Sequence, residues 1–386
     1  YNDNSSLISH ATAPLYNPTI MEDLLYRVAL TFIPKVGAVT ARNLMSYCGS
    51  ARAVFEARHR ELLKIPGVGA QIADNIRSKT ALQVAEQEIQ FMQQQGIRPI
   101  FYLDEDYPCR LKHLPDSPPL LYYRGQASLN PERCVAIVGT RKPTPLGVRH
   151  CEELVEGLKA YGATVISGLA FGIDVAAHKA CLQQELSTIG VVAHGLGRIY
   201  PPQHRSVAYR MVQENGGLLS EYPSDTRPDR ERFPMRNRII AGLCDALIVV
   251  ETKRRGGSMI SAKMANDYHK DVFAVPGRLN DRQSEGCNLL IKSHRAALIE
   301  SVEDLAYVMR WEKADQPAAI QPRLFVDLSE AEECIVSLLR ERELLSIDHL
   351  TQLTQRTNSE LVRLLLELEF KGVVQSLPGK QYMLVR

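Results

Sequence analysis

The sequence CVAIVGTRKPTPLGVRHCEELVEGLKAYGATVISGLAFGID, residues 134–174, has two short apolar runs on either side of a longer amphipathic stretch. The apolar runs, 134–138 and 163–167, have the length and composition of buried β-strands, and a glycine-containing loop follows each. The stretch 146–161 has apolar residues at helical spacing. Strand, helix and strand in this order form the repeating unit of a parallel α/β sheet.

The same alternation continues through the middle of the chain. Further strand-like runs are 188–193, 217–220, 246–250 and 271–275, the helical stretches are 174–184, 204–214, 235–243 and 258–269, and a last strand and helix are 297–300 and 302–309. The proline-broken stretch 97–125 before the series is expected to be a strand-rich connector. The sequence therefore predicts an α/β domain over 96–311 with a Rossmann-like, doubly wound, mostly parallel sheet.

A short repeat precedes this domain. Ile-Pro-Lys-Val-Gly-Ala at 33–38 recurs as Ile-Pro-Gly-Val-Gly-Ala at 65–70, and helical patterns at 21–32, 40–47, 51–64 and 70–78 enter and leave the two copies. This arrangement predicts a helix-hairpin-helix domain over 21–95. Its hairpins either expose backbone N–H groups to DNA phosphates or belong to a protein scaffold of the same shape. Residues 1–20 are expected to be disordered or an expression remnant.

The end of the chain predicts a winged-helix domain over 327–386, after a linker at 312–326. Three amphipathic helices are expected at 329–342, 346–354 and 358–371, followed by two β-like runs around Pro378-Gly379. The third helix has three glutamates against Arg363 and Lys371, which disfavours entry into a major groove. We therefore expect a protein-interaction module, and the alternative is that Lys380 and Arg386 contact a DNA backbone.

Composition excludes several classes of protein. The chain has 386 residues, of which 45% are hydrophobic and 23% charged, with a formal charge of +2. These values indicate a globular protein of two or three domains without general attraction to nucleic acid. No apolar run is long enough to cross a membrane, and no signal peptide is visible. The eight cysteines lack any CxxC spacing, so we expect free, mostly buried thiols in a reducing cytoplasm.

Glycine-containing loops follow the predicted strands at Gly139-Thr140-Arg141, at Ser167-Gly168 and at Gly256-Gly257-Ser258. In an open α/β sheet these loops border the ligand crevice, and the following helices present N–H groups to an anion. The alternative is that the glycines only permit tight turns. A dinucleotide is disfavoured because Arg141 stands where the fingerprint needs a second glycine. We therefore expect a phosphate-bearing ligand and no bound cofactor.

The segment 227–238 is the most basic in the chain. It contains five arginines and Phe233 against two acidic residues, a pattern that suits a strand with exposed bases. The alternative is a solvated loop that caps the next helix. Asp174 and His178 stand four residues apart, and we interpret them as a helix cap and a histidine satisfied by packing or hydrogen bonding. No nucleophile with an evident base is present.

Eight short motifs occur together within 134–295: VAIVGTR (135–141), SGLAFGID (167–174), IYP (199–201), LLSEYP (218–223), FPMRNRIIAGL (233–243), VVE (249–251), GGSMISA (256–262) and FAVPG (273–277). In this series the chain resembles the DprA/Smf family of bacterial DNA-processing proteins. The resemblance implies a central Rossmann-like domain between a helix-hairpin-helix (SAM-like) domain and a winged helix. It also implies a cytoplasmic, single-stranded DNA-binding recombination mediator that protects incoming DNA in natural transformation and helps load RecA.

The resemblance further implies which residues contact DNA. Arg141 in the G-x-R motif, and Arg236 and Arg238 in the R-N-R motif, would contact the backbone, and Phe233 would stack on a base. The expected DNA-binding residues are Gly139, Arg141, Ser167, Gly168, Phe233, Arg236, Asn237, Arg238, Gly257 and Ser258. No enzyme activity, metal or membrane contact is expected, and a homodimer is expected.

Two other classes of protein remain open. Lysine-decarboxylase-like phosphoribohydrolases share the α/β plan and a Gly-Gly loop, but they need a glutamate just after that loop. In this sequence, residues 258–263 read SMISAK and contain no carboxylate. A pure protein-binding scaffold would not explain the basic segment, although that class still fits the winged helix taken alone.

Overall fold

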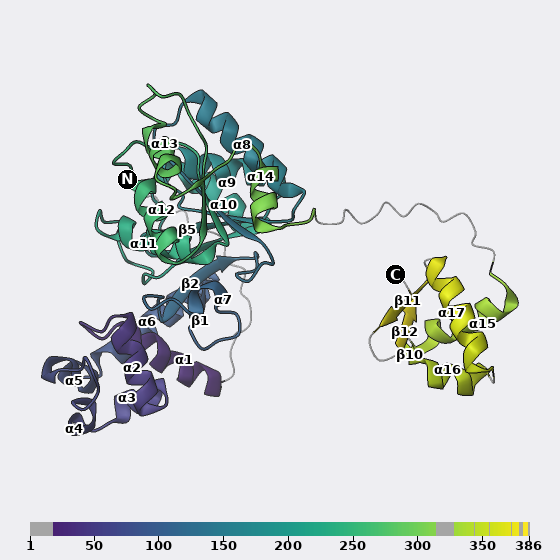
Figure 1. Ribbon diagram of the computed structural model, residues 1–386. Helices are drawn as coiled ribbons and strands as arrows, with labels where there is room; N and C mark the ends of the chain where they lie inside the picture. Colours follow the sequence, from purple (N-terminus) through teal and green to yellow (C-terminus); the bar gives the residue numbers. More distant parts are fainter. Residues whose placement is uncertain are drawn as a thin grey trace. The chain divides into compact units, whose positions relative to one another are not determined.

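The computed structural model describes residues 18–313, 328–342, 344–354, 356–371, 373–377 and 381–384. The expectations for residues 1–17, for most of the linker, for Pro378-Gly379 and for Lys380 and Arg386 lie outside this part of the chain. The chain divides into two compact units, Tyr1–Ala314 and Asp315–Arg386 (Figure 1).

A nine-stranded sheet forms the centre of the first unit, with the strands in the order β1-β2-β6-β5-β4-β3-β7-β8-β9. Strands β3 to β9 pair in parallel, and β2 and β1 extend one edge in antiparallel fashion. Their bounds are β1 (Arg98–Phe101), β2 (Leu120–Gly125), β3 (Cys134–Val138), β4 (Thr164–Ser167), β5 (Thr188–Val191), β6 (Gly216–Ser220), β7 (Ala246–Val249), β8 (Asp271–Ala274) and β9 (Ala297–Leu298). The prediction of a doubly wound, mostly parallel sheet is confirmed.

Helices cover both faces of this sheet (Figure 1). They are α7 (Cys109–Lys112), α8 (Pro145–Lys159), α9 (Ile173–Gln183), α10 (Arg205–Gln213), α11 (Arg232–Leu243), α12 (Gly257–Asp267), α13 (Glu285–Lys292) and α14 (Val302–Met309), with a 3-10 turn at Pro202–His204. Because alternate residues of a strand point to opposite faces, Val135 and Ile137 pack with α8, α9 and α14, whereas Ala136 and Val138 pack with α11, α12 and α13. Burial on both faces explains the continuous apolar runs of these strands.

The strand order reverses between β3 and β7. The chain leaves β3 toward β4 on one side and returns from β6 to β7 on the other. At such a switch point the loops at the carboxyl ends of the strands diverge and leave a crevice. Gly172, with φ of 85°, lets the loops after β3 and β4 pack closely, because a Cβ there would lie 2.1 Å from the Thr140 carbonyl oxygen.

Among the residues from 18 onward, six helices precede the sheet: α1 (Pro18–Thr31), α2 (Ala38–Cys48), α3 (Ala51–Glu56), α4 (His59–Leu62), α5 (Ala70–Arg77) and α6 (Thr80–Gln95). The two repeated turns join α1 to α2 and α4 to α5, and the helix that follows each turn donates a hydrogen bond to the other turn. Asn43 donates to the Pro66 carbonyl over 3.1 Å, and Asn75 donates to the Pro34 carbonyl over 3.4 Å. The predicted single helix over 51–64 is wrong, because Glu61 accepts the N–H of Arg58 and begins a new helix there.

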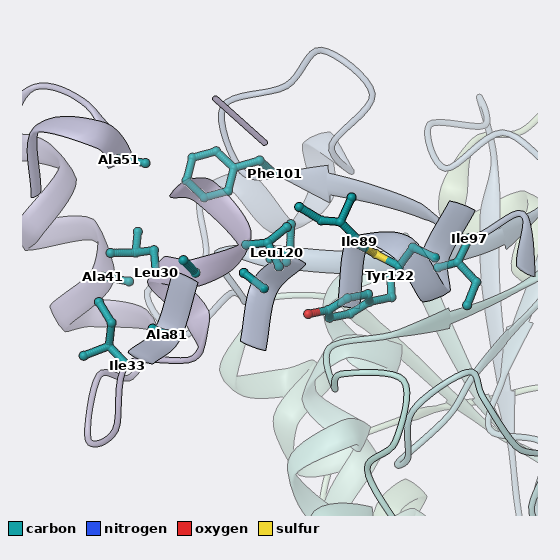
Figure 2. Close-up of a cluster of buried hydrophobic side chains, with 14 of the residues drawn as sticks. Leu30, Ile33, Ala41, Ala51, Ala81, Ile89, Ile97, Phe101, Leu120 and Tyr122 are labelled. Atoms are coloured by element: carbon teal, nitrogen blue, oxygen red, sulfur yellow. The ribbon is translucent and has the colours of Figure 1, made fainter. Parts of the chain in front are cut away.

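The helical part and the sheet share one buried cluster (Figure 2). Leu30 and Ile89 from the helices pack with Phe101, Leu120 and Tyr122 from β1 and β2. The predicted connector at 97–125 therefore belongs to the main sheet as its antiparallel edge. Helix α6, which was not predicted, supplies much of this contact. The local sequence pattern alone does not reveal that these helices pack against the sheet.

The described residues of the second unit form three helices, α15 (Glu330–Arg342), α16 (Ile347–Thr354) and α17 (Asn358–Phe370). A three-stranded sheet completes it, with β10 (Leu344–Ser346), β11 (Val374–Leu377) and β12 (Gln381–Leu384) in the order β10-β12-β11. Strand β10 was not predicted, but the arrangement is the winged helix expected from the sequence.

All eight cysteines are free, and five of them are buried, as the sequence predicted. Within the described residues, no helix combines the length and the hydropathy that a membrane span requires.

Candidate nucleic-acid interface

A crevice with a volume of about 630 Å3 opens at the switch point of the sheet. It lies between the loops after β3 and β7 and the first turns of α11 and α12. The charged residues that line it are Arg141, Asp174, Arg230, Arg236, Lys253 and Arg255. Five of these six are cations, and the one carboxylate, Asp174, is buried. The crevice therefore suits an anionic ligand.

Two aromatic side chains stand beside these cations. The ring centroids of Tyr200 and Phe233 are 6.2 Å apart, and the guanidinium carbon of Arg141 lies 5.3 Å from the centre of the Phe233 ring. Arg141 is exposed and takes part in no ion pair within the described part of the chain. Phe233 therefore orients a charge that remains available to a ligand.

Arg236 lies under the crevice, with only 5% of its surface exposed. Its guanidinium donates to the Val191 carbonyl, and its Nε donates to Asn237 Oδ1 over 3.2 Å. Burial lowers its pKa, and the nearby Asp174 carboxylate opposes that shift. A Cβ at Gly168 would come within 2.6 Å of both terminal nitrogens of Arg236, so a larger residue there would displace the guanidinium. Arg236 is thus anchored while still lining the crevice.

Arg238 points elsewhere, although it is only two residues further along α11. It is 8% exposed, forms an ion pair with Glu221, and donates to the Asp116 carbonyl over 2.6 Å. Asn237 lines the crevice, but Arg238 does not. The structure therefore separates the predicted Arg-Asn-Arg contact group, because successive residues of a helix lie about 100° apart around its axis. The helix predicted over 235–243 begins three residues earlier than expected, because α11 starts at Arg232.

Some of the predicted site residues after β3 and β4 line the crevice or its neighbouring pocket, and one does not. Gly139 lines the crevice, and Gly168 lines a small pocket of about 40 Å3 that shares Arg141, Tyr200 and Phe233 with it. Ser167, in contrast, is buried within the sheet, where its Oγ donates to the Ile137 carbonyl over 2.6 Å. Its role in the structure is to join neighbouring strands.

The N-terminus of α12 forms one wall of the crevice. The N-cap residue is Gly256, which has no side chain to accept a hydrogen bond from the first turn. No capping side chain therefore pairs with the first N–H groups of the helix. A Cβ at Gly257 would meet nothing within 4 Å, so the approach is open. Ser258 is buried, and its Oγ has no hydrogen-bond partner among the described residues. Unpaired N–H groups at a helix N-terminus are typical of sites that bind phosphate oxygens.

Sequence reasoning missed Tyr200, Lys253 and Arg255 as crevice residues. The run Lys253-Arg254-Arg255 directly before Gly256-Gly257 was a usable signal, because it follows a predicted strand at its carboxyl end. Tyr200 had a weaker signal, since a single tyrosine in a loop has many possible environments.

Asp174 and His178 are not arranged as a catalytic pair. His178 Nδ1 lies 2.7 Å from Thr188 Oγ1, and burial lowers its pKa to about 3. The prediction that His178 is satisfied by hydrogen bonding is confirmed at this nitrogen. Gly172, not Asp174, is the N-cap of α9. Burial raises the pKa of Asp174, while Arg236 and the N–H groups of Ala170 and Gly168 oppose the shift.

Metal chemistry has no evident site in the described part of the chain. No group of three or more histidine, cysteine, aspartate or glutamate side chains there is placed to hold a metal ion.

Three family models match the chain. The model for DNA recombination-mediator protein A matches residues 98–310, which contain the sheet and the crevice. The model for the DprA winged helix domain matches 315–380, and a helix-hairpin-helix motif matches 28–89.

Curated relatives and solved structures agree with these models. Protein Smf of Synechocystis sp. is 31% identical over 389 residues, covering 92% of this chain and 98% of that protein. DNA processing protein DprA of Bacillus subtilis is 40% identical over 213 residues, or 55% of this chain and 71% of that protein.

The X-ray structure of DprA from Streptococcus pneumoniae has a TM-score of 0.65 and 31% identity, covering 75% of this chain and 99% of that chain. A Helicobacter pylori DNA processing protein A, whose structure concerns its single-stranded DNA binding mode, has a TM-score of 0.51 and 32% identity, over 56% and 97% of the two chains. With the recombination-mediator model matched across the whole sheet and its crevice, the chain belongs to the DprA/Smf family of DNA-processing proteins.

Proposed function

We propose that the crevice binds single-stranded DNA with little sequence preference. In this proposal the protein is a cytoplasmic mediator that protects an incoming strand in natural transformation and helps load RecA onto it. The observation that carries the DNA part is the position of Arg141 over Phe233 in a crevice with five cations. The single-stranded DNA binding mode of the Helicobacter pylori relative also supports the DNA part, and membership in a family matched by the recombination-mediator model supports the role of mediator.

The chemistry of the crevice favours a single strand over a duplex. Single-strand sites combine a basic groove for the backbone with aromatic rings on which bases stack. Phe233 and Tyr200 supply such rings next to Arg141 and Lys253. A base can reach these rings only if it is unstacked from its neighbours, so duplex DNA does not meet this requirement.

The predicted contact residues take three roles in this proposal. Arg141, Phe233, Asn237, Gly257 and Ser258 contact the strand. Gly139 and Gly168 allow close approach of the loops, whereas Arg236, Arg238 and Ser167 hold the frame from below. This division follows the burial and internal hydrogen bonds of the last three side chains.

We further propose that the protein has no turnover of its own. A nucleotide hydrolase of the phosphoribohydrolase type needs a carboxylate beside its Gly-Gly loop, and the first turn of α12 has none. The carboxylate that does line the crevice, Asp174, accepts backbone N–H groups of Gly168 and Ala170 and is buried. No observation in the crevice favours the hydrolase.

The test compares fluorescent single-stranded and duplex oligonucleotides of equal length in a salt titration. We expect tighter binding to the single strand and a steep loss of affinity as salt rises. Mass spectrometry of the same oligonucleotides and of nucleoside monophosphates after incubation is expected to show no product. Equal affinity for the duplex, or release of a base, would contradict the proposal.

A further inference from the structure

The helix α17 of the winged-helix unit carries an exposed apolar stripe. Val362, Leu366 and Phe370 follow one another at intervals of four residues and are 49%, 52% and 85% exposed. The opposite face of the helix packs in the core of the unit through Leu361, Leu364, Leu365 and Leu368. At 1.5 Å rise per residue, the stripe is about 12 Å long. A phenylalanine this exposed next to two other apolar side chains is typical of an interaction surface.

Charged residues border the stripe in an ordered way. Arg363 and Glu367 lie along one edge of it, where Arg363 Nε is 3.9 Å from Glu367 Oε1. Glu369 lies along the other edge, where it accepts a hydrogen bond from Ser376 Oγ over 2.7 Å. A duplex would repel this helix, because three glutamates outnumber its single arginine. The ligand of the stripe is therefore an apolar surface with matching charges.

The stripe is complementary to itself. In an antiparallel pair of α17 helices related by a two-fold axis at Leu366, Val362 faces Phe370 of the second copy, and Leu366 faces its own equivalent. The two-fold axis keeps each edge on its own side, so Arg363 meets Glu367 of the second copy. These two residues then differ by about 3 Å along the helix axis, within reach of both side chains. Self-complementarity of this kind is what a symmetric interface requires.

We propose that α17 is a self-association surface, through which the winged helices of two copies of this chain pack antiparallel. The surface is short, so the association is weak and of the transient class. Copies held close together by another contact would pair through it readily, because their effective concentration is high. The proposal stands independently of the crevice and its ligand.

Cysteine cross-linking in the full chain tests the geometry. Leu366→Cys places two thiols at the two-fold axis, in a background with Cys109→Ser and Cys334→Ser, which removes the two exposed native thiols. Ser337→Cys is the control, because Ser337 is exposed on α15 and lies off the stripe. We expect mild oxidation to convert the Leu366→Cys protein to a disulfide-linked dimer many times faster than the control. Equal rates would overturn the proposal.

A charge exchange tests the pairing of the edges. Arg363→Glu alone sets like charges against each other and is expected to slow cross-linking at Leu366→Cys. Arg363→Glu combined with Glu367→Arg restores opposite charges across the axis and is expected to restore the rate. Circular dichroism checks that the winged helix remains folded, which exposed positions allow. A double exchange no faster than the single one would show that an undirected apolar contact, and not this pair, forms the dimer.

Discussion

Three arginines near the crevice carry the same charge in three different environments. Arg141 is exposed beside Phe233, Arg236 is buried but reaches the crevice floor, and Arg238 is paired with Glu221 beneath it. An exposed, unpaired guanidinium is available to a ligand, whereas loss of a buried, paired one leaves its partner's charge uncompensated. Substitutions at Arg141 and Arg238 should therefore change different quantities.

Replacing Arg141 by alanine should remove one backbone contact. For a single strand, the slope of log affinity against log salt should then decrease in magnitude by about 0.7. Fluorescence anisotropy at several salt concentrations measures both the affinity and the slope. Arg149→Ala is the matched control, since Arg149 is exposed on α8 outside the crevice. If Arg141→Ala behaves like Arg149→Ala, the backbone does not contact Arg141.

Replacing Arg238 by alanine should cost stability, because it leaves the Glu221 carboxylate, whose side chain is only 13% exposed, without its partner. Removing one member of a buried ion pair costs about 3–5 kcal/mol in the free energy of unfolding. Urea denaturation measures the loss. The double variant Arg238→Met with Glu221→Leu should recover much of it, because no unpaired charge remains. The salt slope of DNA binding should be unchanged in any variant that stays folded.

At the scale of elements, strand ends and helix starts determine the crevice. The strands of the sheet were predictable because their burial on both faces leaves continuous apolar runs. The glycine loops were predictable too, because each directly follows one of those apolar runs. The start of α11 at Arg232 was not predictable, because its arginines are neutralised or hydrogen-bonded by partners distant in the sequence, such as Glu221 and Val191. A local pattern of charge cannot show such partners.

The candidate site was therefore predicted in outline and not in detail. Arg141, Phe233 and Gly257 were predicted because each lies within a recognisable motif. Ser167 and Arg238 do not face the crevice, since the face on which a side chain lies depends on helix phase and strand pairing. The split of α3 from α4 has a different cause, a local hydrogen bond from the Arg58 N–H to Glu61 that the helical pattern over 51–64 did not reveal.

Ser258 at the start of α12 gives a prediction at this scale. Its buried hydroxyl has no partner in the described part of the chain, so Ser258→Ala should leave the free energy of unfolding unchanged or raise it by up to about 1 kcal/mol. The same change should weaken single-strand binding several-fold, because the hydroxyl is lost as a donor to phosphate. Thermal unfolding and anisotropy on one sample measure both effects. A loss of stability together with normal binding would assign Ser258 to the fold alone.

At the scale of the whole molecule, the two units separate two kinds of interaction. The crevice lies entirely within the first unit, and the winged helix forms its own core. Deleting residues 317–386 should therefore leave single-strand affinity within a few-fold of the full chain. Anisotropy with a short oligonucleotide, which seats a single copy, makes this comparison. A loss of a hundredfold or more would place the DNA site on the winged helix.

The central claim is that bases of a single strand stack on Phe233 in the crevice. The chain has one tryptophan, Trp311, so Phe233→Trp combined with Trp311→Phe leaves a single indole at the proposed platform. Stacking is worth about 1–3 kcal/mol per base, enough to hold a base against the ring. Titration with oligothymidylate should quench this fluorescence in parallel with the anisotropy of a labelled strand, and abasic oligonucleotides should bind with little quenching. Full binding by anisotropy with no quenching by oligothymidylate would contradict the account.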